Sequence, residues 1–279
     1  GIPAPESKIL PAWLSRHEGK NSGTVVIWSD YDRQTDTAPV VIEQTKPWIG
    51  RTFRKFIWDG VNIFVNGERI FAVDPLYVET KQTKFPNDPK AAEVEAMKIE
   101  WPVPEDVCEF EGQKSTITIR LSLLPEELRL TQGSGNSMAS KERHIPQNEG
   151  ISITRMGREV FYGPVPYWPG PSKWFAEIDR WWGCEIEFEP LLDRSFTVKN
   201  IKRGAVPNKE LKKAIFDLIS PTVTGFLDTV REKWSEEKAL QERERAEKEL
   251  HKTGHEGAEE TAKKAFTDST SKSVNDPVK

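Results

Sequence analysis

The pair Asn66-Gly67 is the feature that most restricts how this chain can fold. Two runs rich in β-branched and aromatic residues, 61–65 and 69–73, flank the pair directly. A two-residue connection between strands needs positive φ at both positions, and asparagine and glycine tolerate this backbone best. The sequence therefore predicts an antiparallel hairpin centred on residues 66 and 67.

Strands are predicted elsewhere from two patterns, the alternation of polar and apolar residues and short continuous apolar runs. Tight turns again support one of these predictions. The residues concerned are 24–28 as a short buried strand, 116–124, a second hairpin of 151–153 and 159–161 around Met156-Gly157, and 185–189 as a half-buried strand.

An amphipathic helix is predicted over residues 46–58, because apolar residues recur there at helical spacing. Gly60 follows where helices commonly end in a left-handed residue. Residues 39–45 are expected to form a short connection, and the Gly-, Ser-, Asn- and Gln-rich stretch 131–149 a mobile loop. The polar side of the helix carries Arg51, Arg54 and Lys55.

A long helix is predicted from Asn208, which has a side chain suited to capping the first turn. Leu211, Ile215 and Ile219 line one face, and Pro221 is expected to kink or restart the helix. The apolar stripe then gives way to Glu/Lys/Arg repeats. Together the elements predict an α+β fold, one mixed sheet backed by helices with a C-terminal helical extension.

Composition restricts the classes of function. The net charge of −4 provides no global field that attracts nucleic acid or an anionic membrane. No apolar run approaches the roughly 20 residues needed to span a bilayer. Cys108 and Cys184 lack metal-ligand spacing, and so few cysteines are typical of reduced thiols in a cytoplasmic protein.

Three patterns favour ordinary surface positions over ligand sites. The stretch 133–138 lacks the third glycine of a dinucleotide-binding loop and has no strand leading directly into it. Asp30 and Asp32 are two carboxylates at a predicted strand end, where a solvated turn is the commoner arrangement. His251 and His255 lie four residues apart but have no third soft ligand nearby for zinc.

One basic stretch is a better candidate for binding. Residues 196–204 carry Lys199, Lys202 and Arg203 between the last predicted strand and the helix from Asn208. An ammonium group on such a loop is a flexible point charge suited to a phosphate. A solvated basic turn is the alternative.

Several segments resemble the GHKL ATPase fold shared by gyrase-type topoisomerases, heat-shock chaperone ATPases, histidine kinases and mismatch-repair ATPases. Residues 23–28, Gly-Thr-Val-Val-Ile-Trp, resemble its Gly-Thr-led final strand. The helix over 46–58 and the Asn66-Gly67 hairpin resemble the closing elements of that module in bacterial chaperone-like and MORC-like members. Residues 150–160 resemble the entry to the transducer domain, and residues 180–186 with the basic loop resemble the bacterial branch.

The resemblance implies a role for the basic loop. In such proteins a transducer lysine contacts the terminal phosphate of ATP, and Lys202 is the best match for it. Lys199 is the rival candidate, and Arg203 is the implied cofactor-binding neighbour. ATP and magnesium are the cofactors implied for the intact protein, with none bound by this chain alone.

The ATP-binding motifs of the family are absent from the 279 residues, and the chain opens at Gly1 without a methionine. The resemblance therefore implies a transducer fragment of an ATP hydrolase, inactive alone, with a transducer-type (ribosomal-protein-like) domain. Its implied partners are the missing N-terminal ATPase domain and, in a homodimer, a second copy. The implied division is 1–22 as an extended lead-in, 23–95 as the end of the ATPase module with a linker, 96–207 as the transducer domain, 208–252 as the long helix and 253–279 as a disordered tail.

Two other functions stay open. A non-catalytic interaction module would use the Trp/Pro-rich loop 164–174 and the charged helix 231–250. Nucleic-acid binding would use the basic cluster between residues 199 and 213. A role in chromosome handling or phage defence is what the resemblance to the MORC-like branch suggests. The basic cluster consists of Lys199, Lys202, Arg203, Lys209, Lys212 and Lys213.

Overall fold

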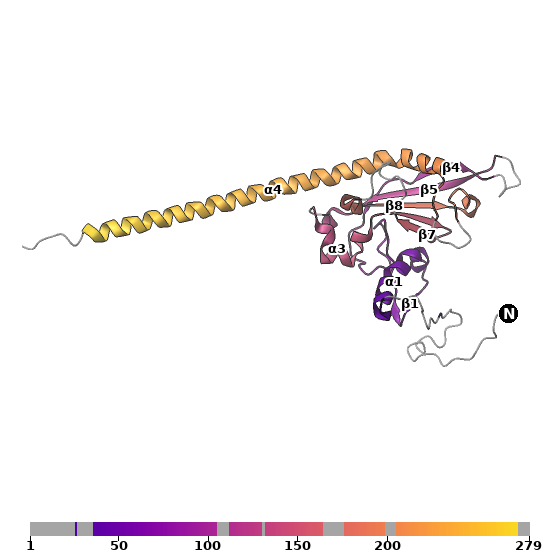
Figure 1. Ribbon diagram of the computed structural model, residues 1–279, viewed down its shortest axis with the longest axis horizontal. Coiled ribbons are helices and arrows are strands. Elements are labelled where there is room, and N and C mark those ends of the chain that lie inside the picture. The colour runs from indigo at the N-terminus through magenta and orange to yellow at the C-terminus, as the bar shows by residue number, and fades with distance from the viewer. Residues whose placement is uncertain are drawn as a thin grey trace, which may run out of the picture.

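The computed structural model has a mixed β-sheet with a long helix on one side and a small helical unit on the other (Figure 1). It describes residues 26, 36–104, 112–129, 132–163, 176–198 and 205–272. Beyond residue 249 it describes the backbone and the side chain of Lys263 alone.

The described elements are helices α1 (Ala38–Thr52), α2 (Arg54–Trp58), α3 (Met138–Glu142) and α4 (Lys209–Lys272), strands β1 (Phe64–Val65), β2 (Glu68–Arg69), β3 (Ala92–Glu93), β4 (Met97–Pro102), β5 (Lys114–Leu123), β6 (Ile151–Arg155), β7 (Arg158–Gly163) and β8 (Trp182–Phe188), and 3-10 turns η2 (Glu126–Leu128), η3 (Ser134–Asn136), η4 (Ile145–Gln147), η5 (Glu177–Trp181) and η6 (Pro190–Leu192).

Six strands of the described part form the main sheet, in the order β3-β5-β8-β6-β7, with β4 also paired to β5. The β6–β8 pair is parallel and the others are antiparallel, so the sheet is mixed. Because successive side chains alternate between the two faces of a strand, this register determines which side chains lie on each face of the sheet.

One face of the sheet is apolar and is covered by the first part of α4. Ile119 of β5, Ile153 of β6 and Ile186 of β8 are fully buried there. Leu211 and Ile215 pack onto them from α4, in one continuous cluster. Each such side chain stabilises the fold by about 1.5–3 kcal/mol when it leaves water, so this contact fixes the start of α4 on the sheet.

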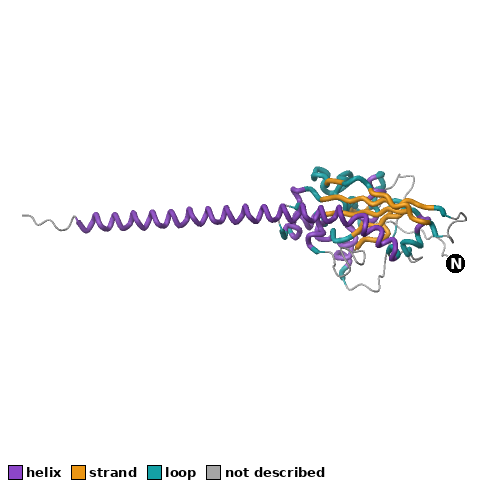
Figure 2. The backbone as a smooth tube through the Cα atoms, turned by 90° about the horizontal axis from the view of Figure 1, so that it is seen from above, coloured by secondary structure: helices purple, strands orange, loops and turns teal. Residues whose placement is uncertain are grey.

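Beyond the sheet, α4 continues as an exposed helix (Figures 1 and 2). Val230 is the last fully buried residue of α4, and side chains 238–249 are all exposed. At 1.5 Å per residue, residues 238–272 extend about 50 Å away from the globular part.

The helical unit on the opposite side of the sheet has its own small core. We call residues 38–73, with α1, α2 and the β1–β2 hairpin, the N-terminal unit. Ile57, Ile70 and Ala72 are buried at its centre. None of the residues in this cluster belongs to the cluster between the sheet and α4.

Most predicted elements are confirmed. Asn66 and Gly67 have φ of 49° and 81°, and Met156 and Gly157 have φ of 50° and 75°, as both hairpin turns require. Gly60 has φ of 98° after α2. The Asn208 Oδ1 accepts a hydrogen bond from the Leu211 N–H at 2.9 Å, which is the predicted cap.

Three predictions near the start of the chain and in its middle are wrong. Residues 39–45 are helical, because Pro39 lies in the first turn of α1, where its fixed φ favours helix initiation. Val26, from the predicted strand 24–28, has no regular structure and is 71% exposed, and the other four residues lie outside the described part. The stretch 132–149 forms η3, α3 and η4 around the fully buried Ile145, with Ser137 capping α3.

Two predictions concern α4 beyond its capped start. Pro221 does not restart the helix, which continues as one element on both sides of it. Residues 253–272, expected to be disordered, extend the same helix. Their composition explains this, since alanine, glutamate and lysine have high helix propensity and the pairs Glu259–Lys263 and Glu260–Lys264 have the favourable i,i+4 spacing.

The N-terminal unit is joined to the sheet at a tight crossing. A Cβ placed on Gly183 of β8 would lie 2.3 Å from the Pro75 carbonyl oxygen and 2.9 Å from the Leu76 Cα. The Ser122 hydroxyl donates to the Leu76 carbonyl at 2.6 Å. The chain can therefore run across β5 and β8 only because residue 183 has no side chain.

We predict that Gly183→Ala destabilises the protein by about 1–3 kcal/mol, because backbone must move to accommodate the methyl group. Gly225, inside α4, is the matched control, since a Cβ there meets nothing within 4 Å. Gly225→Ala should stabilise by about 0.5–1 kcal/mol. Urea unfolding measures both, and an unchanged midpoint for Gly183→Ala would contradict the crossing.

Candidate functional site

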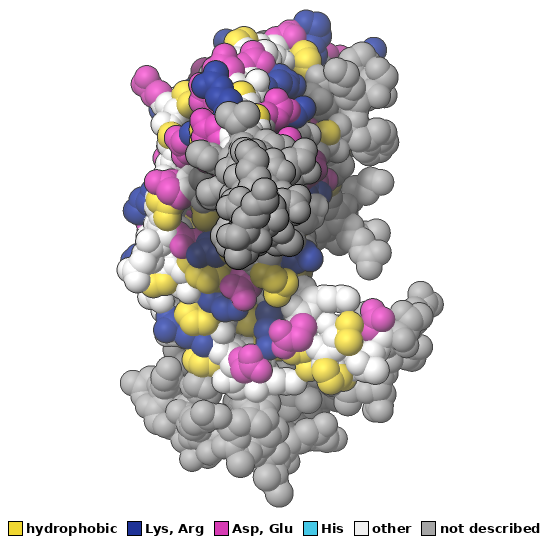
Figure 3. Space-filling model, turned by 90° about the vertical axis from the view of Figure 1, so that its left-hand side faces the viewer, with side chains coloured by type: hydrophobic (Ala, Val, Ile, Leu, Met, Phe, Trp, Pro, Cys, Tyr) yellow, Lys and Arg dark blue, Asp and Glu magenta, His cyan; other side chains and the backbone are white. Residues whose placement is uncertain are grey.

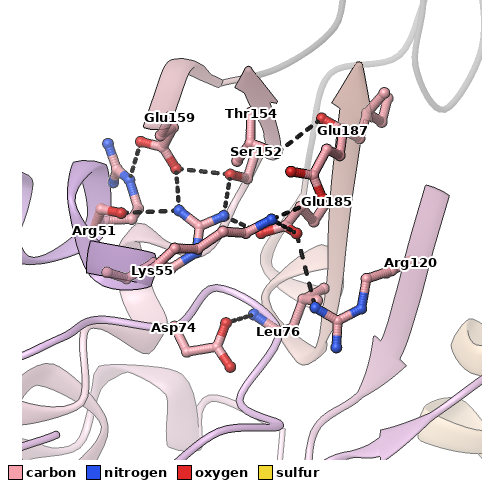
Figure 4. Close-up of polar contacts among 12 residues, drawn as sticks. Arg51, Lys55, Asp74, Leu76, Arg120, Ser152, Thr154, Glu159, Glu185 and Glu187 are labelled. Atoms are coloured by element: carbon pink, nitrogen blue, oxygen red, sulfur yellow. Dashed lines mark hydrogen bonds and ion pairs between the residues drawn. The ribbon is translucent and has the colours of Figure 1, made fainter. Parts of the chain in front are cut away.

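A buried cluster of charges joins the N-terminal unit to the second face of the sheet (Figure 4). Side chains on this face are polar, in contrast to those beneath α4, because they occupy the alternate positions of the same strands. We call this group the ion cluster. Its members are Arg51, Arg54, Lys55, Ser152, Glu159, Glu185 and Glu187.

Arg54 is the centre of the ion cluster. Its guanidinium donates to Glu159 Oε2 at 3.2 Å, to Ser152 Oγ at 2.8 Å and to Glu185 Oε2. These three partners come from β7, β6 and β8, which lie side by side in the sheet. The side chain of Arg54 is 1% exposed. One side chain of α2 thus bonds to three neighbouring strands at once.

Lys55 and Arg51 extend the cluster toward solvent. Lys55 Nζ lies 2.9 Å from a carboxylate oxygen of Glu185 and 2.9 Å from one of Glu187. Arg51 Nε donates to Glu159 Oε1 at 2.8 Å, and its guanidinium stacks 3.8 Å from the centre of the Tyr162 ring. The buried carboxylates therefore have more than one cationic partner each.

The environment sets the charge of the two central groups. Burial alone lowers the pKa of Arg54, but the carboxylates of Glu185 and Glu159 raise it above its ordinary value. Burial raises the pKa of Glu185, but the charges of Arg54 and Lys55 outweigh burial and lower it below its ordinary value. Both groups therefore stay ionised at neutral pH, as a paired buried charge requires.

The arrangement holds two parts of the chain together and does not resemble a reactive site. Glu185 faces two cations that lower its pKa, so it is not held protonated as a general acid. Cys184 lies on the apolar face beneath α4, is fully buried, and burial raises the pKa of its thiol well above the ordinary range. The ion cluster is best suited to positioning.

The sequence-predicted site residues Lys199, Lys202 and Arg203 lie outside the described residues, and so does the loop 164–174. The structure does describe the residues on either side of the basic loop, 195–198 and 205–208, which we call the base of the loop. Thr197 Oγ1 donates to the Val206 carbonyl at 2.6 Å, which ties the two sides of that base together.

Two further contacts fix the same base. The Asn208 N–H donates to the Ser195 carbonyl at 2.8 Å. The ring of Phe196 stacks on that of Phe188, the last residue of β8, with 3.9 Å between centroids. The loop that carries the predicted lysines is thus attached to β8 on one side and to the capped end of α4 on the other.

The other half of the predicted basic cluster is described. Lys209, Lys212 and Lys213 lie in the first turns of α4, and Lys213 forms an ion pair with Asp217 at 2.6 Å. On the face shown in Figure 3, basic and acidic side chains of the described residues are interspersed. Nucleic-acid binding stays a prediction.

The described residues bear on metal sites and on membrane spans. They contain no group of three or more His, Cys, Asp and Glu side chains placed to hold a metal ion. Asp30 and Asp32 lie outside them, as do the side chains of His251 and His255. Among the same residues, no helix combines the length and the apolar character that crossing a bilayer requires.

Comparisons of the chain with models of protein families, with curated proteins and with solved structures found no match.

The ion cluster was not predicted from the sequence, although its parts were. The basic side chains were predicted on the polar side of an amphipathic helix, and the alternating glutamates of residues 185–189 in a half-buried strand. The helix side is basic and the strand side is acidic, and this complementary charge could have indicated that the two pack together. Glu185 is 1% exposed, so the prediction of a half-buried strand is wrong at this position.

We predict that the protein loses stability as the pH falls below about 4.5, the ordinary pKa of a glutamate such as Glu185. A carboxyl whose folded pKa is lowered stabilises the fold above its unfolded pKa, and this contribution disappears as pH falls through the folded pKa. Glu185→Gln should flatten the dependence of the urea midpoint on pH below about 4.5.

Glu187→Gln is the matched control, since Glu187 lies on the same strand and face but its side chain is 41% exposed. It should keep most of the pH dependence. Asp74 is buried nearby, and burial raises its pKa, so its contribution has the opposite sign. The difference between the two variants, rather than the wild-type curve, therefore isolates Glu185, and equal curves would contradict its assigned role.

Proposed function

We propose that this chain is the transducer portion of a GHKL-type ATPase of the cytoplasm. In this function it couples ATP binding and hydrolysis in an N-terminal nucleotide-binding domain to conformational change and dimerisation. The observation that carries the proposal is that one sheet holds the N-terminal unit on one face and the base of a long helix on the other (Figure 1).

Strand β8 supports this coupling because it contacts both sides. Glu185 bonds to Arg54 of the N-terminal unit, while its neighbour Ile186 packs in the cluster under α4. A shift of the N-terminal unit that displaced β8 would act directly on α4. Packed elements of this kind transmit small displacements because a close-packed core resists continuous deformation.

The basic loop is the second support. Its base connects β8 to the capped start of α4 through Phe196 and Asn208. In the proposed function Lys202, or its rival Lys199, pairs with the terminal phosphate of ATP, with Arg203 beside it. ATP and magnesium would be bound by the nucleotide-binding domain. Hydrolysis would remove the lysine's partner and change the equilibrium between two domain arrangements by about 1–3 kcal/mol.

We predict that Lys202→Ala lowers ATP turnover at least about tenfold in the protein that carries the nucleotide-binding domain, which corresponds to about 1.4 kcal/mol of lost transition-state stabilisation. Lys199→Ala tests the rival in the same assay. Urea unfolding of both variants checks that the fold itself is unaffected.

Lys98→Ala is the control, since Lys98 is an exposed lysine of β4. It should leave turnover within about twofold of wild type, as expected for a surface position away from special features. Unchanged turnover in both Lys202→Ala and Lys199→Ala would remove the loop from the proposed role. Salt-dependent DNA binding by this chain, with no effect of either variant on turnover, would favour nucleic-acid binding by the basic cluster instead.

A further inference from the structure

The N-terminal unit and the sheet have separate apolar cores. Ile57, Ile70 and Ala72 form the centre of the unit, and all residues packed against them lie between positions 49 and 65. The core of the sheet is on its other face, under α4. Two bodies with separate cores can move relative to one another if the contact between them is not itself an apolar core.

The contact between them is polar. Arg51, Arg54 and Lys55 approach the sheet through hydrogen bonds and ion pairs with β6, β7 and β8. Among the described residues, three aromatic rings also take part. Arg51 stacks on Tyr162, Arg158 lies above Phe53 at 5.5 Å, and Phe56 lies close to Gly157 in the β6–β7 turn. The described contacts between the two bodies are therefore mainly polar.

The chain connection between the bodies is short. The Val73 N–H donates to the Gly50 carbonyl at 3.2 Å, so Val73 belongs to the unit. Leu76 belongs to the sheet, through its bond from Ser122 and its contact with Gly183. Two residues at positions 74 and 75 lie between them. The unit is also linked to a loop outside the sheet. Ala72 forms a parallel bridge with Thr83, in which the Ala72 N–H donates to the Gln82 carbonyl at 2.9 Å, and the Arg69 side chain donates to that of Gln82.

Open space borders this joint. A cleft of about 380 Å³ lies between the unit and the segment that follows it. Lys46 and Arg69 line it from the unit, and Tyr77, Phe85 and Arg143 line it from the other side. The two bodies therefore have room to change their angle on this side.

We infer that the N-terminal unit is a separable rigid body that pivots at Asp74–Pro75, and that Arg54 is the latch that holds it on the sheet. The physiological use of such a latch rests on the proposed function, in which the nucleotide-binding domain would act on the unit. The latch itself depends only on the contacts described here.

Burial makes the latch act in an all-or-none manner. Removing one partner from a buried ion pair leaves an uncompensated charge, which is strongly unfavourable. A partly opened joint would leave Arg54 or Glu185 buried without its oppositely charged partner. Full separation lets water reach all the charges together. The docked and the released arrangements are therefore the two favourable states, as a switching element requires.

The test is hydrogen–deuterium exchange of this chain without nucleotide, followed by mass spectrometry. In the wild type, amides of α1 and α2 should exchange through an opening with a smaller urea dependence than amides of β5 and β8, because less surface is exposed. Arg54→Met should accelerate exchange in residues 38–73 at least tenfold. Exchange in β5, in β8 and in α4 up to Val223 should stay within twofold.

Lys46→Met is the matched control, because the two partners of Lys46, Glu43 and Glu68, both lie inside the unit. It should leave exchange across the joint unchanged. Equal acceleration throughout the chain in Arg54→Met, failure of this variant to fold, or unchanged exchange in residues 38–73 would each overturn the latch. None of these results bears on Lys202, and unchanged ATP turnover in Lys202→Ala leaves the latch intact.

Discussion

The guanidinium of Arg54 carries a full positive charge at a place that water barely reaches, and the arrangement around it follows from that constraint. A buried charge is tolerated only when it is paired and hydrogen-bonded. Its partners Glu159, Ser152 and Glu185 come from three adjacent strands, so a shift by one residue in any of them would turn a partner to the other face. The ion pairs that attach the N-terminal unit therefore form only in the observed register of β6, β7 and β8.

Alternation along the strands separates two kinds of attachment. The apolar face holds α4 through close packing, which is non-directional and strong in sum. The polar face holds the N-terminal unit through directional bonds between opposite charges. The first attachment is suited to permanence. The second is suited to release, because separated charges regain their hydration in water whereas separated apolar side chains do not. A sheet with this asymmetry provides a fixed output element and a detachable input element, which is the property that the proposed transducer function needs.

Strand β8 takes part in both the proposed ATPase function and the proposed latch. The ATPase function depends on the resemblance of several segments and on Lys202, in a loop that leaves from the end of β8. The latch depends on Glu185 in the middle of the same strand. The pairing of Arg54 with Glu159 and Glu185 was not evident in the sequence, because residue 54 lies more than a hundred positions from either partner. Charge alone marked the basic side of residues 46–58 and the glutamates of 185–189, but an amphipathic pattern gives the same polar face whether it contacts water or another polar face.

The sequence by itself determined the local elements: both tight turns, the helix end at Gly60 and the cap at Asn208 follow from backbone preferences of a few adjacent residues. It also determined which side of each strand is apolar, since that pattern has a period of two. Only the tertiary structure decided where the polar faces lie. Glu185 is buried because α2 docks on it, and residues 132–149 are ordered because Ile145 reaches a core built from distant segments. Burial of this kind is a property of neighbours in space, which composition and periodicity along the chain do not specify.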